Sequence, residues 1–89
     1  MTWEIGISRQ AERFLKQHHL PDQFATESVR KAIQRLQGEA IAINIKRLFG
    51  KWKGCFRVRI DKNRIIFSID FERHSALVEI IDNRGRAYK

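Results

Sequence analysis

The sequence has little of several features that would tie it to particular classes of protein. It holds one cysteine, Cys55, so no disulfide can form within the chain, and its three histidines have no spacing typical of a zinc site. No apolar run approaches the roughly 20 residues of a membrane-spanning helix, and residues 1–10 lack the apolar stretch of a signal peptide. We therefore expect a cytoplasmic protein without membrane contact, bound metal or other cofactor.

Linker-like segments are also missing from the sequence. It has a single proline, Pro21, and no repeat or low-complexity tract. Hydrophobic residues make up 43% of the chain and charged residues 31%, a balance that excludes an intrinsically disordered protein. Since the chain has 89 residues and domains usually have roughly 100–150, we expect residues 1–89 to form a single domain.

What the sequence has in excess is positive charge, with a formal net charge of +8. The excess is local: residues 44–64 carry eight basic residues and one acidic residue, whereas residues 65–89 are neutral in sum. The eight are Lys46, Arg47, Lys51, Lys53, Arg57, Arg59, Lys62 and Arg64. A solubilising surface does not require such clustering, so the pattern favours contact with a nucleic acid.

The order of hydrophobic patterns predicts the fold class. Residues 2–7 alternate as in a half-buried strand, and apolar residues at helical spacing follow the candidate N-cap Ser8. A second helical stripe over residues 22–37 lies between Pro21 and Gly38. Ile41, Ile43 and Ile45 alternate as in a short strand or an extended loop, residues 48–54 form a loop, and strands are expected over residues 55–60, 64–71 and 76–81. We predict an α+β fold with an N-terminal strand, an α-helical hairpin and an antiparallel β-meander.

The strands over residues 55–60 and 64–71 can be paired if Lys62 and Asn63 form a two-residue turn. Paired residues share a sheet face, and this pairing separates two kinds of side chain. One face collects Phe56, Val58, Ile60, Ile65, Phe67 and Ile69, and the other collects Cys55, Arg57, Arg59, Asp61, Arg64, Ser68 and Asp70. We expect the helical hairpin to cover the apolar face and the polar face to stay open to solvent.

Three arginines on one sheet face, beside the loop Lys51-Trp52-Lys53, indicate a surface that binds phosphate. Trp52 could stack on a base or cap the edge of the core. Positive potential on this face would favour the thiolate of Cys55, but no histidine is placed to assist a nucleophilic role. His18, His19 and His74, at a helix end and in a turn, are poor catalytic candidates.

Two segments carry a resemblance to a known family. The run IKRLFGKWKGCFRVRIDKNRIIFSID, residues 45–70, followed by EIIDNRGRAY, residues 79–88, resembles the RelE/ParE superfamily of bacterial toxins. The shared pattern is a glycine-containing loop, a strand with two alternating basic residues, a tight turn, an arginine, an apolar strand, and a terminal arginine followed by tyrosine. The chain length, starting strand and helical hairpin fit the family as well.

The resemblance implies a RelE-like fold and, for the RelE branch, a type II toxin that cuts mRNA on the ribosome as a metal-independent endoribonuclease. The family's active-site positions correspond to Arg57, Arg59, Arg64, Arg84 and Tyr88. The surrounding residues expected to contact RNA are Lys46, Arg47, Lys51, Trp52, Lys53, Lys62 and Arg86. The implied partners are the ribosome, mRNA and a cognate antitoxin protein. The alternatives are a ParE-like toxin that poisons DNA gyrase and a non-catalytic nucleic-acid-binding module.

Cleavage of RNA without a metal requires a group that accepts the proton of the attacking 2′-hydroxyl. Arginine does not lose its proton in proteins, so the arginines suit charge stabilisation and not this step. RelE-type proteins often carry lysine at the positions of Arg57 and Arg59, which this chain does not. Lys51, Lys53, Asp82 and Tyr88 stay open as candidate proton acceptors.

Overall fold

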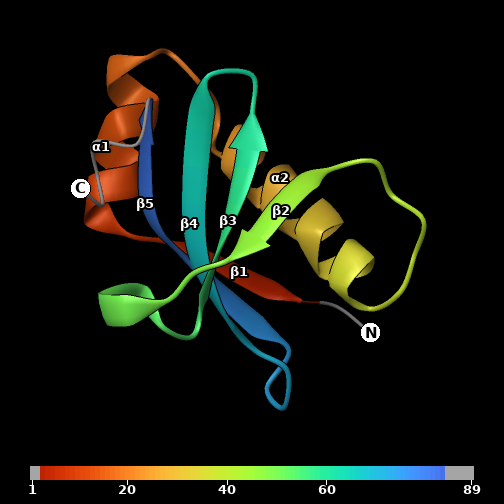
Figure 1. Ribbon diagram of the computed structural model, residues 1–89. Coiled ribbons are helices and arrows are strands. Elements are labelled where there is room, and N and C mark those ends of the chain that lie inside the picture. The colour runs from red at the N-terminus through yellow and green to blue at the C-terminus, as the bar shows by residue number, and fades with distance from the viewer. Residues whose placement is uncertain (1–2, 84–89) are drawn as a thin grey trace.

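The computed structural model describes residues 3–83, and Figure 1 shows the elements along the chain. A strand leads into two helices, and the remaining strands follow with a short 3-10 helix between them. The elements are β1 (Glu4–Ile7), α1 (Arg9–Gln17), α2 (Asp22–Leu36), β2 (Asn44–Arg47), η1 (Gly50–Trp52), β3 (Cys55–Ile60), β4 (Asn63–Asp70) and β5 (Ser75–Asn83). The predicted α+β fold class is confirmed.

The strands of the described part form one sheet in the order β1-β5-β4-β3-β2. β3 to β5 form the antiparallel meander that the sequence predicts. β2 extends it as a further antiparallel strand, where the sequence leaves a strand or a loop open for Ile41, Ile43 and Ile45. β1 adds to the far side of β5 in parallel orientation, so the sheet as a whole is mixed. The N–H of Ser8 extends this contact by donating to the carbonyl of Val78 at 2.9 Å. The first and last strands along the chain therefore lie side by side, which leaves β1 and β2 as the two edges.

The helical hairpin begins and ends close to the residues that the sequence marks. Ser8 is the N-cap of α1: its Oγ accepts a hydrogen bond from the N–H of Ala11 at 3.1 Å and donates one to the carbonyl of Glu79. Gly38 follows α2 with a φ of 99°, a conformation that glycine adopts without strain. Pro21, expected in the first turn of the second helix, is its N-cap instead. Neither helix of residues 3–83 is long and apolar enough to cross a membrane.

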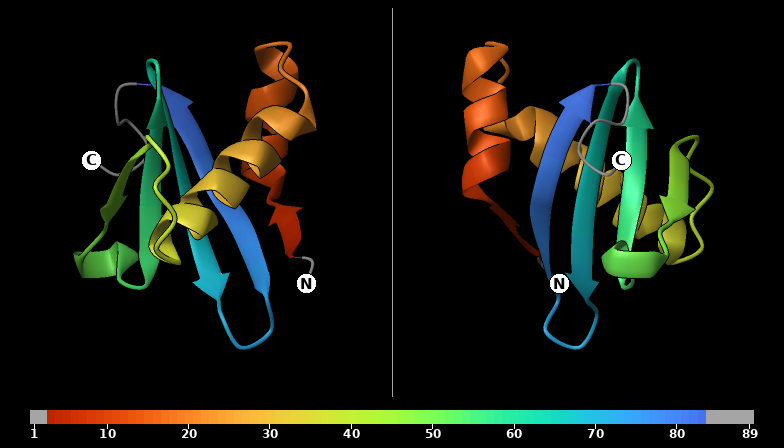
Figure 2. Two further views of the ribbon diagram at one scale, coloured as in Figure 1. Left: turned by 90° about the vertical axis from the view of Figure 1, so that its right-hand side faces the viewer. Right: turned by 60° about the vertical axis from the view of Figure 1, so that its left-hand side comes forward.

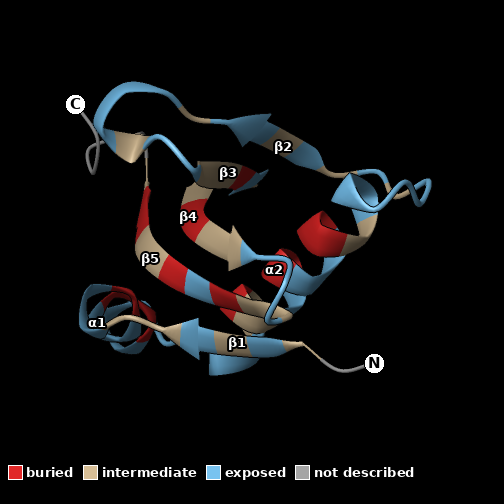
Figure 3. Cartoon of the chain, turned by 90° about the horizontal axis from the view of Figure 1, so that it is seen from below, coloured by how far each residue is buried: buried red, intermediate tan, exposed pale blue. Residues whose placement is uncertain are grey.

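The hydrophobic core lies between the helical hairpin and one face of the sheet (Figure 2). Figure 3 shows its buried residues on both helices and along β4 and β5. The buried core residues are Ala11, Phe14, Leu15, Ala25, Val29, Ala32, Ile33, Val58, Ile65, Phe67, Ala76, Val78 and Ile81. Phe56, Ile60 and Ile69 pack against them, so the predicted apolar face of β3 and β4 is confirmed.

The predicted pairing of β3 with β4 is wrong by two residues. Ile60 pairs with Asn63 and Phe56 with Phe67, so the turn consists of Asp61 and Lys62 and not of Lys62 and Asn63. Asp61 has a φ of 55°, which a short polar side chain tolerates. Side chains alternate with a period of two, so a shift of two residues leaves each side chain on its predicted face.

β5 contains a bulge that the sequence analysis did not foresee. Ile66 pairs with Ile80 and Phe67 with Val78, so Glu79 is an extra residue opposite β4. The bulge changes the phase of the alternation along β5. Val78 and Ile81 both lie in the core although three positions separate them, and Asp82 consequently pairs with Arg64 on the opposite face.

Candidate nucleic-acid interface

Four basic side chains from β2, β3 and β4 lie on the sheet face away from the core. Lys46 pairs with Arg57, and Arg59 pairs with Arg64. Directly paired residues have Cβ atoms roughly 4.5–5.5 Å apart, so the four side chains are neighbours. We call this cluster of Lys46, Arg57, Arg59 and Arg64 the basic face. The structure thus brings together the three arginines that the sequence placed on one face and adds Lys46 to them.

An apolar residue forms the floor of the basic face. Ile66 lies between Arg57 of β3 and Ile80 of β5, and it is 1% exposed although it is not part of the core cluster. Arg59 is exposed, whereas Arg57 and Arg64 are half-buried. The polar face is therefore open at Arg59 and partly covered at Arg57 and Arg64, where the aliphatic stems of arginines can lie over an apolar floor.

The basic face contains hydrogen-bond donors whose bonding capacity is not met within residues 3–83. Nη2 of Arg57 donates to Oδ1 of Asn44 at 3.3 Å, but its Nε is buried without a partner. Nε and Nη1 of Arg64 are buried without a partner as well, and so is Nε1 of Trp52. A buried donor left unsatisfied costs about 1–3 kcal/mol. An oxyanion that accepted from these nitrogens would remove that cost, which is the behaviour expected of a preformed phosphate site.

The predicted lysines and Trp52 lie at the two ends of the basic face. Lys51 and Trp52 belong to η1, and Lys53 follows it in the connection between β2 and β3. At the base of this connection, the N–H of Leu48 donates a hydrogen bond to the carbonyl of Cys55. Lys62 is exposed in the turn at the other end of β3. Trp52 is half-buried, and the described residues that pack against the core do not include it.

Arg47, which is predicted to contact RNA, does not lie on the basic face. It pairs with Phe56, and its guanidinium carbon lies 5.7 Å from the centre of that ring, on the core side of the sheet. The alternation of Ile43 and Ile45 continues to position 47, a signal that could have placed Arg47 correctly. Asn44, which binds Arg57, was missed because it has no charge. Arg84, Arg86 and Tyr88 lie outside the described residues.

Acidic groups border the basic face on the β5 side. Asp82 is 9% exposed and pairs with Arg64 in the register, and Glu79 accepts a hydrogen bond from Oγ of Ser68 at 3.0 Å. Burial raises the pKa of the Cys55 thiol, and the negative charge of Glu79 raises that pKa further. The expectation that the arginines favour the thiolate is therefore wrong. Within residues 3–83 no three His, Cys, Asp or Glu side chains are grouped as metal ligands.

Comparison with known proteins finds similarity at the level of structure. The sequence matches no family model and no curated protein. A chain of the toxin–antitoxin complex RelBE2 from Mycobacterium tuberculosis is 25% identical with a TM-score of 0.60, covering 94% of this chain and 100% of that one. A chain of the archaeal RelE–RelB complex from Pyrococcus horikoshii is 22% identical with a TM-score of 0.61, covering 97% and 99%. A chain of the YoeB–YefM complex from Staphylococcus aureus is 13% identical with a TM-score of 0.61, covering 94% and 99%.

These likenesses extend over nearly the full length of both chains, so they concern the whole arrangement of strands and helices. They agree with the resemblance carried by the loop, the basic strand and the apolar strand of residues 45–70. The chain has the RelE-like fold of the RelE/ParE superfamily of toxins.

Proposed function

We propose that the chain is the toxin of a type II toxin–antitoxin system and cleaves ribosome-bound mRNA without a metal ion, which blocks translation. The observation that carries the proposal is the basic face, with unsatisfied buried donors on Arg57 and Arg64, on a RelE-like fold. Surface cations without a ligand usually point into water, whereas these nitrogens are withdrawn from water and have no hydrogen-bond partner within residues 3–83.

The chemistry follows from what guanidinium groups do well. The 2′-hydroxyl gives up its proton and its oxygen attacks the adjacent phosphorus, the bond from phosphorus to the 5′ oxygen breaks, and charge develops on the non-bridging oxygens. The products are a 2′,3′-cyclic phosphate and a 5′-hydroxyl, whose proton comes from solvent. In our proposal Arg57 and Arg64 stabilise that charge above the apolar floor of Ile66, where water is displaced and the interaction is strengthened. Arg59 and Lys46 hold neighbouring phosphates so that the reacting atoms stay in line.

The remaining predicted residues complete the proposed site. Arg84 and Tyr88 are proposed to contribute from the C-terminal residues, with Arg86 on the RNA backbone. Among the candidate proton acceptors, the Asp82 carboxylate is the one that pairs with a member of the basic face, Arg64. Lys51 and Lys53 are exposed in the connection from β2 to β3. We also propose a cognate antitoxin as partner, since the similar RelE and YoeB chains come from toxin–antitoxin complexes.

Induced expression of the chain, followed by primer extension on a defined mRNA and a DNA supercoiling assay, tests this proposal. We expect cuts within translated codons that disappear when translation initiation is blocked. Arg64→Ala should abolish these cuts, and Arg73→Ala is its matched control. Arg73 is an exposed arginine whose only ion pair among the described residues is with Asp70 at 3.8 Å. Double-strand DNA breaks with intact mRNA would instead identify a gyrase poison. Normal growth with intact mRNA and DNA would contradict both toxin functions and would favour the non-catalytic nucleic-acid-binding module.

A further inference from the structure

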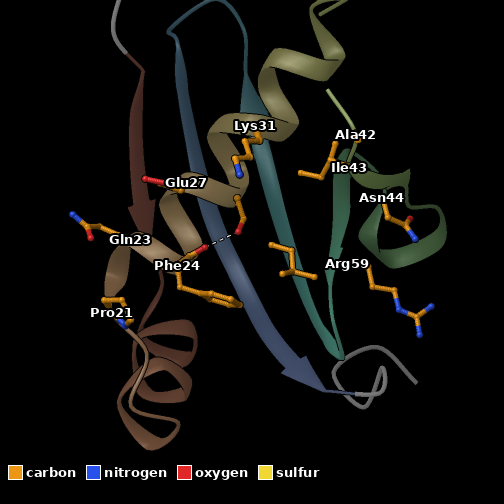
Figure 4. Close-up of a pocket in the computed structure, with 11 residues that line it drawn as sticks. Pro21, Gln23, Phe24, Glu27, Lys31, Ala42, Ile43, Asn44 and Arg59 are labelled. Carbon is orange, nitrogen blue, oxygen red and sulfur yellow. Dashed lines mark hydrogen bonds between the residues drawn. The ribbon is translucent and has the colours of Figure 1, made fainter. Parts of the chain in front are cut away.

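Phe49 is the most exposed large hydrophobic residue in the part of the chain that the structure describes, with an exposed fraction of 76%. The apolar residues on the α2 side of the basic face are different. Phe24, Ile43 and Ile60 line a cavity of about 600 Å³ together with Arg59, and all three pack against the core (Figure 4). Phe49 belongs neither to the residues that line this cavity nor to the described residues that pack against the core. The packing of the fold therefore does not account for an aromatic ring at position 49.

A hydrogen-bonded turn presents Phe49 at one end of the basic face. The carbonyl of Phe49 accepts from the N–H of Trp52 at 3.4 Å, and the carbonyl of Gly50 accepts from the N–H of Lys53 at 3.0 Å. Gly50 has a φ of 69°, a conformation that a residue with a Cβ rarely adopts. Figures 2 and 3 show that η1 lies on the side of the sheet away from the helices, which is the side of the basic face. A residue held in such a turn meets a ligand with little loss of backbone freedom.

The surroundings of Phe49 are positively charged. Lys51 and Lys53 are exposed in the same connection, and no acidic residue occurs in residues 44–60. Nε1 of Trp52 adds a buried donor without a partner within residues 3–83. Proteins that bind single-stranded nucleic acids combine cations for the phosphates with exposed aromatic rings on which bases stack. The connection between β2 and β3 has both components.

A second exposed phenylalanine shows what Phe49 would look like without this setting. Phe71 is 48% exposed, but it stands between Asp70 and Glu72 in the sequence. Its ring packs edge-on against Trp3, with 5.7 Å between the ring centres. The carboxylates on both sides would repel a phosphate, so Phe71 is a poor site for RNA and a good control for Phe49.

We propose that Phe49 stacks on one base of the RNA strand that the basic face binds, and that it favours a purine at that position. The inference rests on the proposed function for its ligand, single-stranded RNA. Lys51 and Lys53 hold the phosphates on either side of the stacked nucleotide, and Nε1 of Trp52 donates to one of its oxygens. Stacking uses the face of the base and not its hydrogen-bonding edge, so the larger purines gain more contact. Phe49 is thus a positioning residue, which fixes the phosphate that lies at Arg64.

Fluorescence anisotropy with a labelled heptauridylate and the full chain tests the stacking. The probe carries 2′-O-methyl groups, so its 2′ oxygens cannot attack phosphorus and it stays intact. We expect Phe49→Ala to weaken binding by about tenfold and Phe49→Trp to retain it. The slope of affinity against salt should not change in Phe49→Ala, because no charge is removed. Phe71→Ala removes a ring of the same size from the acidic turn and should change the affinity by less than about twofold. Thermal melts verify that each variant is folded.

An abasic site moved through the probe locates the stacked base. At one position the missing base should weaken wild-type binding by about tenfold and leave the binding of Phe49→Ala unchanged. Adenine at that position should tighten wild-type binding by about threefold and not that of Phe49→Ala. The proposal is overturned by an abasic cost that is equal in both proteins at every position, by equal losses for Phe49→Ala and Phe71→Ala, or by a wild-type chain that does not bind the probe.

The same measurements separate this inference from the proposed function. Cleavage of ribosome-bound mRNA without any coupling between Phe49 and a base would refute the stacking and leave the proposed function in place. Coupling in a chain that does not cleave mRNA would support the stacking and refute the nuclease.

Discussion

The sheet face away from the helices has two halves that differ in how their polar groups are satisfied. On the basic face, Arg57 and Arg64 keep buried nitrogens without partners among the described residues. On the β5 side, Glu79 accepts from Ser68 at 3.0 Å. Gln10 of α1 also exchanges two hydrogen bonds with the backbone of Ile81, at 3.1 and 3.3 Å. β4 contributes to both halves, with Arg64 on the basic face and Ser68 on the β5 side, so the supporting strand alone does not account for the difference.

The difference separates a binding surface from a structural one. Buried polar groups in folded proteins are nearly always paired, and groups that are not paired require an explanation. On the β5 side the partners belong to the protein itself, and they fasten α1 to the sheet. On the basic face no partner is present among residues 3–83, and the chemistry of guanidinium suits an oxyanion.

Arg64→Ala should reduce mRNA cleavage more than any other substitution proposed here. An unchanged rate would contradict the distinction between a binding half and a structural half. We expect cleavage of ribosome-bound mRNA to fall by about 100- to 1000-fold, because a donor to the developing charge is lost. The buried Nε and Nη1 make no hydrogen bond to the described part of the chain, so the melting temperature should move by about 3 °C or less. Arg64→Lys should recover only part of the rate, since the planar fork is missing. Wild-type turnover in the alanine variant would remove Arg64 from the site.

The salt dependence of RNA binding sharpens the contrast between the two halves. Each phosphate neutralised on a single strand contributes a slope of about −0.7 in log affinity against log salt concentration, so four contacts give about −3. Arg57→Gln should make the slope shallower by about 0.7. Glu79→Gln, on the β5 side, should not make it shallower. A slope near zero in the wild type would leave the basic face without a role in RNA binding.

Ser8→Ala should affect the structural half and spare the binding half. The substitution removes the N-cap of α1 and its link to the carbonyl of Glu79. We expect the free energy of unfolding to fall by about 1–2 kcal/mol, measured by urea denaturation, with unchanged RNA affinity below the melting temperature. Ser8→Asp keeps an acceptor for the N–H of Ala11 and should restore most of the loss. A change in RNA affinity in folded Ser8→Ala would contradict the separation of the halves.

The smallest expected effect is a change in the alkylation rate of the Cys55 thiol. Glu79→Gln removes a negative charge that raises the pKa of Cys55, so the pKa should fall and more thiolate should be present at pH 7.5. Alkylation by iodoacetamide should accelerate by about two- to threefold. Burial, the larger cause, persists, so the reaction should stay slower than in urea-unfolded chain. Slower alkylation in the variant would show that Glu79 does not act on Cys55.

Much of the fold could be predicted because its signals are local. The alternation before Ser8, the helical stripes on both sides of Pro21 and the glycine at position 38 each act within a few residues. The grouping of Arg57, Arg59 and Arg64 was also predictable, because the face of a strand residue depends only on odd or even position. The parallel pairing of β1 with β5 was not, since it joins segments about 70 positions apart whose contact no local pattern specifies.

The errors have physical reasons too. Asp61 and Asn63 both tolerate a positive φ, so the sequence does not distinguish two turns that differ by one position and shift the pairing of β3 with β4 by two residues. Ile66 has the same parity as Arg64 and lies on its face, but an apolar side chain gave no sign of a site, so the floor of the basic face was missed. Asp82 faces Arg64 because of the bulge, and that position follows from three-dimensional pairing and not from alternation.

The bulge in β5 also bears on how the chain could tolerate a change of length. Without Glu79, the remaining positions from Ala76 to Asp82 would alternate regularly between core and opposite face, as their neighbours do now. A one-residue deletion inside a central strand ordinarily turns every following side chain to the wrong face. In this strand a deletion at position 79 should instead straighten the backbone and keep Ile81 buried and Asp82 beside Arg64. Of all positions in the middle of the sheet, this is the one where we expect a shortened protein to fold.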